Sequence, residues 1–181
     1  MLLLYFLLAA VLVGVLAGGR LARLGDVRIR WAGIAVLGLL LQVGLFSPPV
    51  ASLAGQAGPA LYAGSTLLVL AVLLRNVRQP GFWLLAVGAF FNAVAILANG
   101  GFMPVAPAAL TALGEVPPST YSNVAVASAT TAFAWLGDVL VVPRPIPFAN
   151  AVSPGDVLIG LGGAWFVVRS MRRQDPEPVR P

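Results

Sequence analysis

Five apolar stretches, almost free of charged residues, restrict the possible folds of this chain more than any other feature. Only 9% of its residues are charged, against about 25% in ordinary soluble domains, and 59% are hydrophobic. So little polar surface cannot cover a soluble protein, and the sequence therefore predicts an all-α integral membrane protein. The expected transmembrane helices cover about residues 2–18, 31–46, 60–74, 81–98 and 154–168.

Two missing residue types narrow the chemistry that the chain can perform. With no Cys there is no disulfide or thiolate nucleophile, and with no His there is no imidazole base or ligand. We expect no cofactor and no metal site, because two Asp without a regular ligand spacing are a weak basis for Mg²⁺ or Ca²⁺. All eleven basic residues are Arg, grouped in short clusters between apolar stretches. This pattern is typical of topology signals, so no nucleic-acid partner is expected.

The number of spans depends on a sixth apolar run at residues 123–137. If it does not cross the membrane, ten Arg lie in the cytoplasm and only Arg144 lies outside. If it crosses, the ratio falls to seven against four, so the positive-inside rule favours five spans. The N-terminus then lies outside, and the first stretch is a retained span, with a cleaved signal peptide as the alternative.

The five-span topology divides the chain into one membrane domain and a tail. Residues 1–168 form a single polytopic domain, in which 99–153 is a long extracytoplasmic loop. Within that loop we expect 123–137 to be an interfacial or re-entrant helix. The Arg- and Pro-rich tail, 169–181, is expected to lie disordered in the cytoplasm.

Asp156 stands at the start of the last apolar stretch, which is conspicuously short. Ser153 is a natural helix N-cap, Pro154 suits the first helical turn, and Ser153 with Asp156 forms a capping-box pattern. The carboxylate is therefore explained as a helix cap, or alternatively as part of a buried polar site where the helix begins inside the membrane.

Asp138 has a weaker structural explanation. It follows Gly137, which looks like a helix C-terminal residue, and a carboxylate is mildly unfavourable at that end of a helix. A solvated loop position remains the alternative. If Asp138 and Asp156 approach each other, they form a candidate catalytic pair, because neighbouring carboxylates split their pKa values into an acid and a base.

Further polar residues are candidates for a binding site at the outer face. Asn92 and Asn99 lie on one side of the fourth stretch, where an amide faces protein or water, although interhelical hydrogen bonds and a turn explain them equally well. The remaining candidates lie in the outer loop and are Tyr121, Arg144 and Asn150.

Three motifs carry a resemblance to a known family. In order, "ANGGFMPV", "LGDVLVVPRP" and "SPGDVLIGLG" resemble the bacterial domain-of-unknown-function family 5317. The resemblance implies a multi-pass protein of the bacterial cytoplasmic membrane with no established activity.

A second, local likeness concerns the segment "FANAVSPGDVLIGLG". Its residues Phe148, Asn150 and Asp156 are similar to the segment that carries the second catalytic Asp of lipoprotein signal peptidases, which are membrane aspartic proteases. Extra residues separate Asn150 from Asp156 here, and "WLGDV" around Asp138 lacks the Gly-Asn-x-x-Asp-Arg pattern of those enzymes. The likeness implies an Asp138–Asp156 hydrolase.

Three functional hypotheses follow. The favoured one is a non-catalytic binding, accessory or assembly component, with a polar extracytoplasmic pocket for another membrane protein or a small ligand. The second is a membrane-embedded aspartic hydrolase that uses Asp138 and Asp156. The third is a small transporter or channel, suggested by the short last helix.

Overall fold

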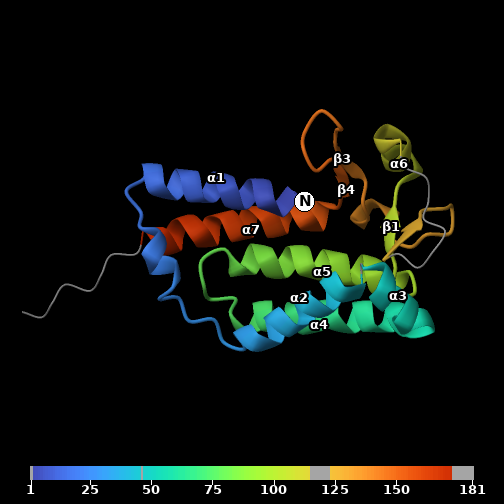
Figure 1. Cartoon of the computed structure of the whole chain (residues 1–181), viewed down its shortest axis with the longest axis horizontal. Helices are drawn as coiled ribbons and strands as arrows, with labels where there is room; N and C mark the ends of the chain where they lie inside the picture. Colours follow the sequence, from blue (N-terminus) through green and yellow to red (C-terminus); the bar gives the residue numbers. More distant parts are fainter. Residues whose placement is uncertain (1, 46, 115–122, 173–181) are drawn as a thin grey trace, which may run out of the picture.

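The computed structural model describes residues 2–45, 47–114 and 123–172, and these residues are mostly helical (Figure 1). Tyr121 and most of the tail lie outside them. Within the described residues, five long helices match the five predicted stretches to within a few residues. They are α1 (Leu2–Leu16), α2 (Ala32–Leu45), α4 (Gly58–Arg75), α5 (Phe82–Ala98) and α7 (Pro154–Met171).

The long helices run alternately in opposite directions, so their connections gather at two ends of the molecule (Figure 1). At one end lie the α1–α2 and α4–α5 connections and the end of α7; we call it the arginine end. The α1–α2 connection contains the 3-10 helix η1 (Leu21–Leu24). At the opposite end, α3 (Pro48–Ala54) and the 3-10 helix η2 (Gly55–Ala57) join α2 to α4.

The last helix is longer than the sequence suggested. The apolar stretch ends at Val168, but α7 continues to Met171 and has 18 residues, or about 27 Å. The extension occurs because Arg169 is a good helix former and the carbonyl of Met171 accepts a hydrogen bond from the backbone N–H of Arg20 (2.9 Å). The helix thus ends three residues later than predicted, and its 18 residues are still fewer than the about 20 of a full transmembrane helix.

Residues 99–114 and 123–153 form a small mixed unit, the head, beside the start of α1 (Figure 1). Two pairs of short strands in it correct the all-α prediction. The helical pieces of the head are α6 (Pro107–Leu113) and η3 (Ala134–Leu136). A parallel pair joins β1 (Met103–Val105) to β2 (Val124–Val126), and an antiparallel pair joins β3 (Leu140–Val142) to β4 (Asn150–Val152).

The predicted interfacial or re-entrant helix at 123–137 is also wrong. Its first part is strand β2, whose β-branched Val124 and Val126 suit extended backbone. A turn follows, in which the N–H of Ser128 donates to Thr131 Oγ1 (2.8 Å). Such local side-chain bonds to the backbone compete with helix formation. Only the three residues of η3 are helical.

Helix α7 occupies the centre of the packing because glycines let its neighbours approach closely. A Cβ atom at Gly162 would lie 2.7 Å from the carbonyl oxygen of Gly81 and 2.7 Å from the backbone nitrogen of Leu85, at the start of α5. On the opposite side, a Cβ at Gly160 would overlap the ring of Phe6 in α1. Small residues at both contacts thus bring α1, α7 and α5 together as one layer.

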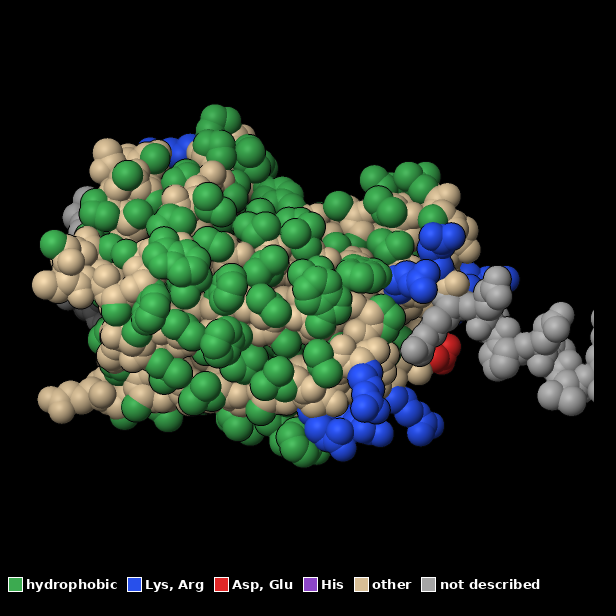
Figure 2. Space-filling view, turned by 180° about the vertical axis from the view of Figure 1, so that it is seen from behind, with side chains coloured by type: hydrophobic (Ala, Val, Ile, Leu, Met, Phe, Trp, Pro, Cys, Tyr) green, Lys and Arg blue, Asp and Glu red, His purple; other side chains and the backbone are tan. Residues whose placement is uncertain are grey.

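Large apolar side chains remain exposed along the helices, and Figure 2 shows them covering the middle of the molecule. Leu12 of α1 and Leu40 of α2, for example, are 60% and 63% exposed. Among the described residues, one helical segment, Pro49–Arg75, is long and apolar enough to cross a membrane by length and composition. Three shorter apolar helices accompany it: Leu2–Leu16, Ala32–Leu45 and Phe82–Ala98.

The glycine contact between α5 and α7 predicts a difference between two adjacent positions. Gly162→Ala places a methyl group against backbone atoms that cannot rotate away, so it is expected to destabilise the protein by about 1–3 kcal/mol. Gly163 is the control, because a Cβ there would have only Leu85 Cδ2 within contact range, at 4.0 Å. Gly163→Ala should leave stability unchanged or raise it by up to about 1 kcal/mol. Thermal unfolding of the two purified variants compares them, and equal melting temperatures would refute the contact.

Candidate functional site

A closed network of hydrogen bonds joins Asn92, Ser153 and Asp156 where α7 begins against α5. Ser153 Oγ accepts from the Asp156 N–H (2.9 Å), and the Ser153 N–H donates to Asp156 Oδ2 (3.1 Å), so the predicted capping box is present. Asn92 Nδ2 donates to Asp156 Oδ1 (2.8 Å), and the Ser153 hydroxyl donates to Asn92 Oδ1 (2.9 Å). Both oxygens of Asp156 are thereby engaged.

The network depends on the close approach of the two helices. A Cβ at Gly155 would lie 2.6 Å from the Gly88 carbonyl oxygen, and a Cβ at Gly88 would lie 2.9 Å from the backbone nitrogen of Ile159. Without side chains at these two positions, the Asn92 amide reaches the first turn of α7. Ser153 is completely buried, so its hydrogen bonds are made without competition from water.

Asp138 lies in the head, where two hydrogen bonds fix its backbone. Its N–H donates to the Pro104 carbonyl (2.7 Å), and its carbonyl accepts from the Ala106 N–H (3.1 Å). The side chain is half-buried and makes no hydrogen bond within the described residues. Burial, and next the negative charge of Asp156, raise the pKa of Asp138 from the usual 3.8 to about 7.

The two predicted catalytic residues are therefore near enough to interact through their charges, but they are not equivalent. Asp156 is tied into the helix cap, whereas Asp138 can take up and release a proton near neutral pH. No hydrogen bond joins the two carboxyl groups in the described part of the chain. The pair can act as one fixed anion beside one titrating acid.

Three of the predicted binding residues lie away from Asp156. Asn99 Nδ2 donates to the carbonyls of Ala95 and Ala132, both at 2.8 Å, so it holds the turn after β2 onto α5. The exposed Arg144 donates from Nη2 to the Gly114 carbonyl (3.2 Å) and pairs with neither Asp138 nor Asp156. Asn150 is exposed on β4. Of the predicted set, the structure brings only Asn92 together with Asp156, while Tyr121 lies outside the described residues.

The sequence interpretation did not place two residues that build the site. Ser153 was identified as a helix cap but not as a partner of Asn92, because 61 positions separate them. The hydroxyl of Tyr5 in α1 donates to the carbonyl of Pro147, which ties the head to the first helix. No local pattern could have predicted a contact across 142 positions.

No metal-binding cluster of three or more His, Cys, Asp or Glu side chains occurs among residues 2–45, 47–114 and 123–172. In these residues no third carboxylate joins Asp138 and Asp156 to form such a cluster. The carboxyl group of Asp138 can exchange a proton and can accept a hydrogen bond or a cation.

These features define a class of mostly helical protein that has a β-containing head and a carboxylate–amide–hydroxyl network joining α5 to the start of α7. The chain belongs to the family of unknown function DUF5317, which matches residues 26–168. The family resemblance drawn from the three motifs is thus confirmed. No curated protein and no solved structure matches the chain significantly. The local likeness to lipoprotein signal peptidases stays a prediction.

The raised pKa of Asp138 predicts a specific pH dependence of stability. The folded protein retains a proton at Asp138 up to about pH 7, whereas the unfolded chain releases it near 3.8. The contribution of Asp138 to the free energy of unfolding is therefore expected to be highest below pH 3.8 and to fall as the pH rises to about 7. Asp138→Asn should remove this fall, because an amide does not ionise.

Thermal unfolding between pH 4 and pH 8 measures the effect. Asp26→Asn is the control, because Asp26 is exposed in the α1–α2 connection, at the opposite end of the molecule. An unchanged slope in Asp138→Asn would contradict the assignment of this titration to Asp138.

Proposed function

We propose that this chain is a five-span protein of the bacterial cytoplasmic membrane, in which residues 1–168 form one membrane domain. The head lies outside and the arginine end in the cytoplasm. The main support is the exposed surface of the helices, which carries large apolar side chains over the middle of the molecule (Figure 2). In water such a surface would associate or aggregate, whereas in a bilayer it contacts lipid.

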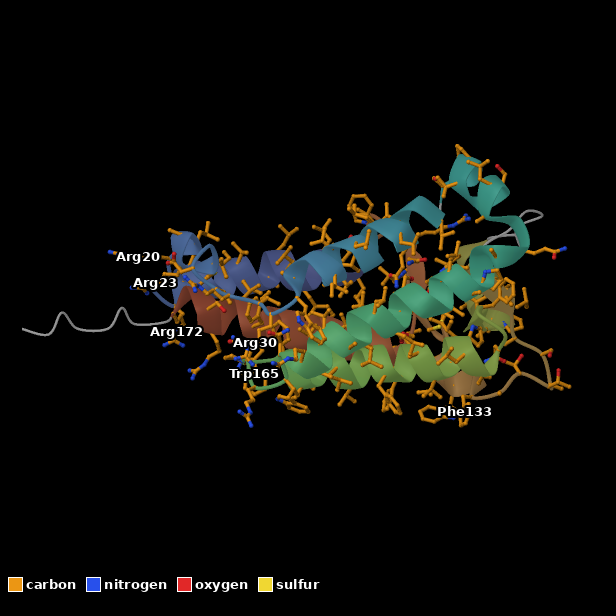
Figure 3. All side chains as sticks on the ribbon, turned by 90° about the horizontal axis from the view of Figure 1, so that it is seen from below. Arg20, Arg23, Arg30, Phe133, Trp165 and Arg172 are labelled. Carbon is orange, nitrogen blue, oxygen red and sulfur yellow. The ribbon has the colours of Figure 1, made fainter. Side chains whose placement is uncertain are left out.

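The distribution of Arg supports the orientation. Of the nine Arg in the described residues, only Arg144 lies in the head. The other eight lie at or near the arginine end, where Figure 3 labels four of them. Because cytoplasmic loops carry the excess of basic residues, this end is assigned to the cytoplasm. The eight are Arg20, Arg23, Arg28, Arg30, Arg75, Arg78, Arg169 and Arg172.

Exposed aromatic side chains agree with this placement. Trp31, Trp83 and Trp165 lie on the half of the molecule nearer the arginine end and are 54%, 47% and 43% exposed. Trp135 of the head is 63% exposed and packs against Phe91 with ring centroids 6.4 Å apart. Trp is enriched at both membrane–water interfaces, where its ring contacts lipid and its N–H reaches water.

The lengths of the helices are compatible with a bilayer that becomes thinner around the protein. Helices of 14 to 18 residues measure about 21–27 Å, which is about 3–9 Å less than the hydrocarbon thickness of about 30 Å. Short spans are accommodated by local thinning and by interfacial Trp and Arg side chains.

Within this framework we propose a binding or assembly function at the outer face. The observation that carries it is the half-buried carboxyl group of Asp138, which makes no hydrogen bond within the described residues and can therefore accept one from a ligand or protein that supplies a donor. Phe133 and Phe148, exposed by 50% and 56%, add apolar surface to the head for such a partner. The transporter alternative rests on the short last helix, and α7 is three residues longer than the apolar stretch suggested.

A membrane-embedded aspartic hydrolase is the second candidate. The separation of roles between a titrating Asp138 and a fixed Asp156 favours it, because acid–base hydrolysis needs two carboxyls in different protonation states. The engagement of both Asp156 oxygens by Asn92 and Ser153 opposes it, since a catalytic carboxylate must contact water or substrate.

The topology is testable by cysteine labelling, because the chain contains no Cys. In intact spheroplasts, a membrane-impermeant maleimide should label Ser128→Cys in the head. It should not label Val77→Cys, which lies between α4 and α5, until the membrane is permeabilised. Both positions are exposed, so differences in burial do not explain the contrast. Labelling of residue 77 alone in intact spheroplasts would reverse the orientation, and release of the protein into the soluble fraction would refute the membrane assignment.

Binding of inhibitors of aspartic proteases tests the hydrolase candidate. Peptides with a hydroxyl that mimics the tetrahedral intermediate bind aspartic dyads far more tightly than substrates do. If the head is a binding surface, such peptides should not raise the melting temperature of the wild type. A rise that disappears in both Asp138→Asn and Asp156→Asn would instead favour the hydrolase.

A further inference from the structure

A cavity of about 650 Å³ lies at the arginine end, between the segment that precedes α2 and the turn that joins α4 to α5. Its volume is within the range of small-molecule sites, about 300–1,000 Å³. Four of the eight lining residues are Arg, contributed in pairs by the two segments. The lining consists of Arg28, Arg30, Leu74, Arg75, Asn76, Val77, Arg78 and Gln79.

Asn76 fixes the two walls of this cavity to each other. It is only 5% exposed, its Nδ2 donates to the Arg30 carbonyl (2.8 Å), and its Oδ1 accepts from the Arg30 N–H (2.9 Å). The same Nδ2 also donates to the Val72 carbonyl (2.8 Å) in the last turn of α4. These bonds fix the backbone of the segment with Arg28 and Arg30 beside the turn with Arg75 and Arg78. The two walls of the cavity are therefore in place before a ligand binds.

The charge in this cavity is not balanced by the described residues. None of the lining residues is acidic, and no described Asp or Glu lies within ion-pair distance of the four guanidinium groups. Arg75 is additionally positioned over Trp31, with its Cζ 5.9 Å from the ring centroid. A role in membrane orientation requires only that Arg residues lie in cytoplasmic loops. It does not explain why the buried Asn76 joins the two segments or why four Arg line one cavity.

Guanidinium groups that line one cavity match phosphate particularly well. Arg presents a planar fork of donors that binds phosphate oxygens in pairs, and several forks around one cavity favour a ligand with more than one negative charge. A bound anion would also relieve the mutual repulsion of the four Arg.

We propose that this cavity binds a phosphate-bearing anion with at least two negative charges, through Arg28, Arg30, Arg75 and Arg78. One source is the head group of an anionic phospholipid in the cytoplasmic leaflet, and this source rests on the proposed membrane function. The other is a soluble phosphate compound, which binds whether or not the protein spans a membrane.

The test uses the full chain in neutral detergent with three probes. They are inorganic pyrophosphate, a short-chain diphosphatidylglycerol as the anionic lipid, and a short-chain phosphatidylcholine as the zwitterionic control. Binding is measured by calorimetry and by native mass spectrometry. The wild type should bind pyrophosphate, the anionic lipid or both, and it should bind phosphatidylcholine at least about tenfold more weakly.

Two double variants separate the cavity from general positive charge. Arg30→Gln with Arg78→Gln removes two lining charges and should weaken binding about tenfold or more. Arg20→Gln with Arg172→Gln removes two exposed charges from the same end but outside the cavity lining, and should change affinity less than about threefold. If the glutamine variant does not fold, Arg30→Lys with Arg78→Lys keeps the charge, loses the forked donors and should still weaken binding.

Each outcome has a definite meaning. Loss of binding in the cavity variants alone supports the site, and the probe that binds identifies the source. Equal losses in the two glutamine variants, or no binding of either anionic probe by the wild type, overturn the site. Pyrophosphate binding in a chain whose cysteine labelling contradicts a membrane topology would reject the proposed function and leave the anion site standing.

Discussion

The close approach of α5 and α7 is the interaction on which the rest of the structure depends. Glycines at both ends of the contact, Gly81 with Gly162 and Gly88 with Gly155, bring the two backbones together without intervening side chains. Only at that separation can Asn92 reach across to Asp156 and Ser153. The head begins at the end of α5 and finishes at the start of α7, so this one contact also determines where Asp138 lies. Close packing and buried polar bonds thus supply the specificity of this contact.

The sequence was sufficient for the long helices and insufficient for what lies between them. Apolar length alone predicted α1, α2, α4, α5 and α7, and Ser153 with Asp156 predicted the helix cap, because both signals are local. The strands of the head were missed because Met103 pairs with Val124 across some twenty positions and each strand has only three residues. Residues 123–137 were predicted as a helix because they are mostly apolar, and the prediction did not consider that their Ser and Thr residues favour a turn.

The candidate site was predictable in its members but not in its geometry. Asp138 and Asp156 were identified as the carboxylates of interest, and the structure places them near enough for one charge to affect the other. Their different roles arise from tertiary contacts: Asn92 lies 64 positions from Asp156, and the burial of Asp138 depends on the fold of the whole head. In the same way, Arg28, Arg30, Arg75 and Arg78 could be interpreted from sequence as topology charges. Only the tertiary structure reveals that they line one cavity, whose two walls are joined by the bonds of Asn76 to Arg30.

The central position of α7 also bears on the order in which the molecule can be built. This helix is synthesised after α1 and α5, yet its residues Val167 and Met171 pack with Ala10 of α1, and its first turn completes the bonds of Asn92. Until it emerges, α1 lacks its principal partner, and the small residues of α5 face no backbone. This part of the molecule therefore does not assemble helix by helix along the chain, and α1 and α5 must stay apart or loosely paired until α7 has been synthesised.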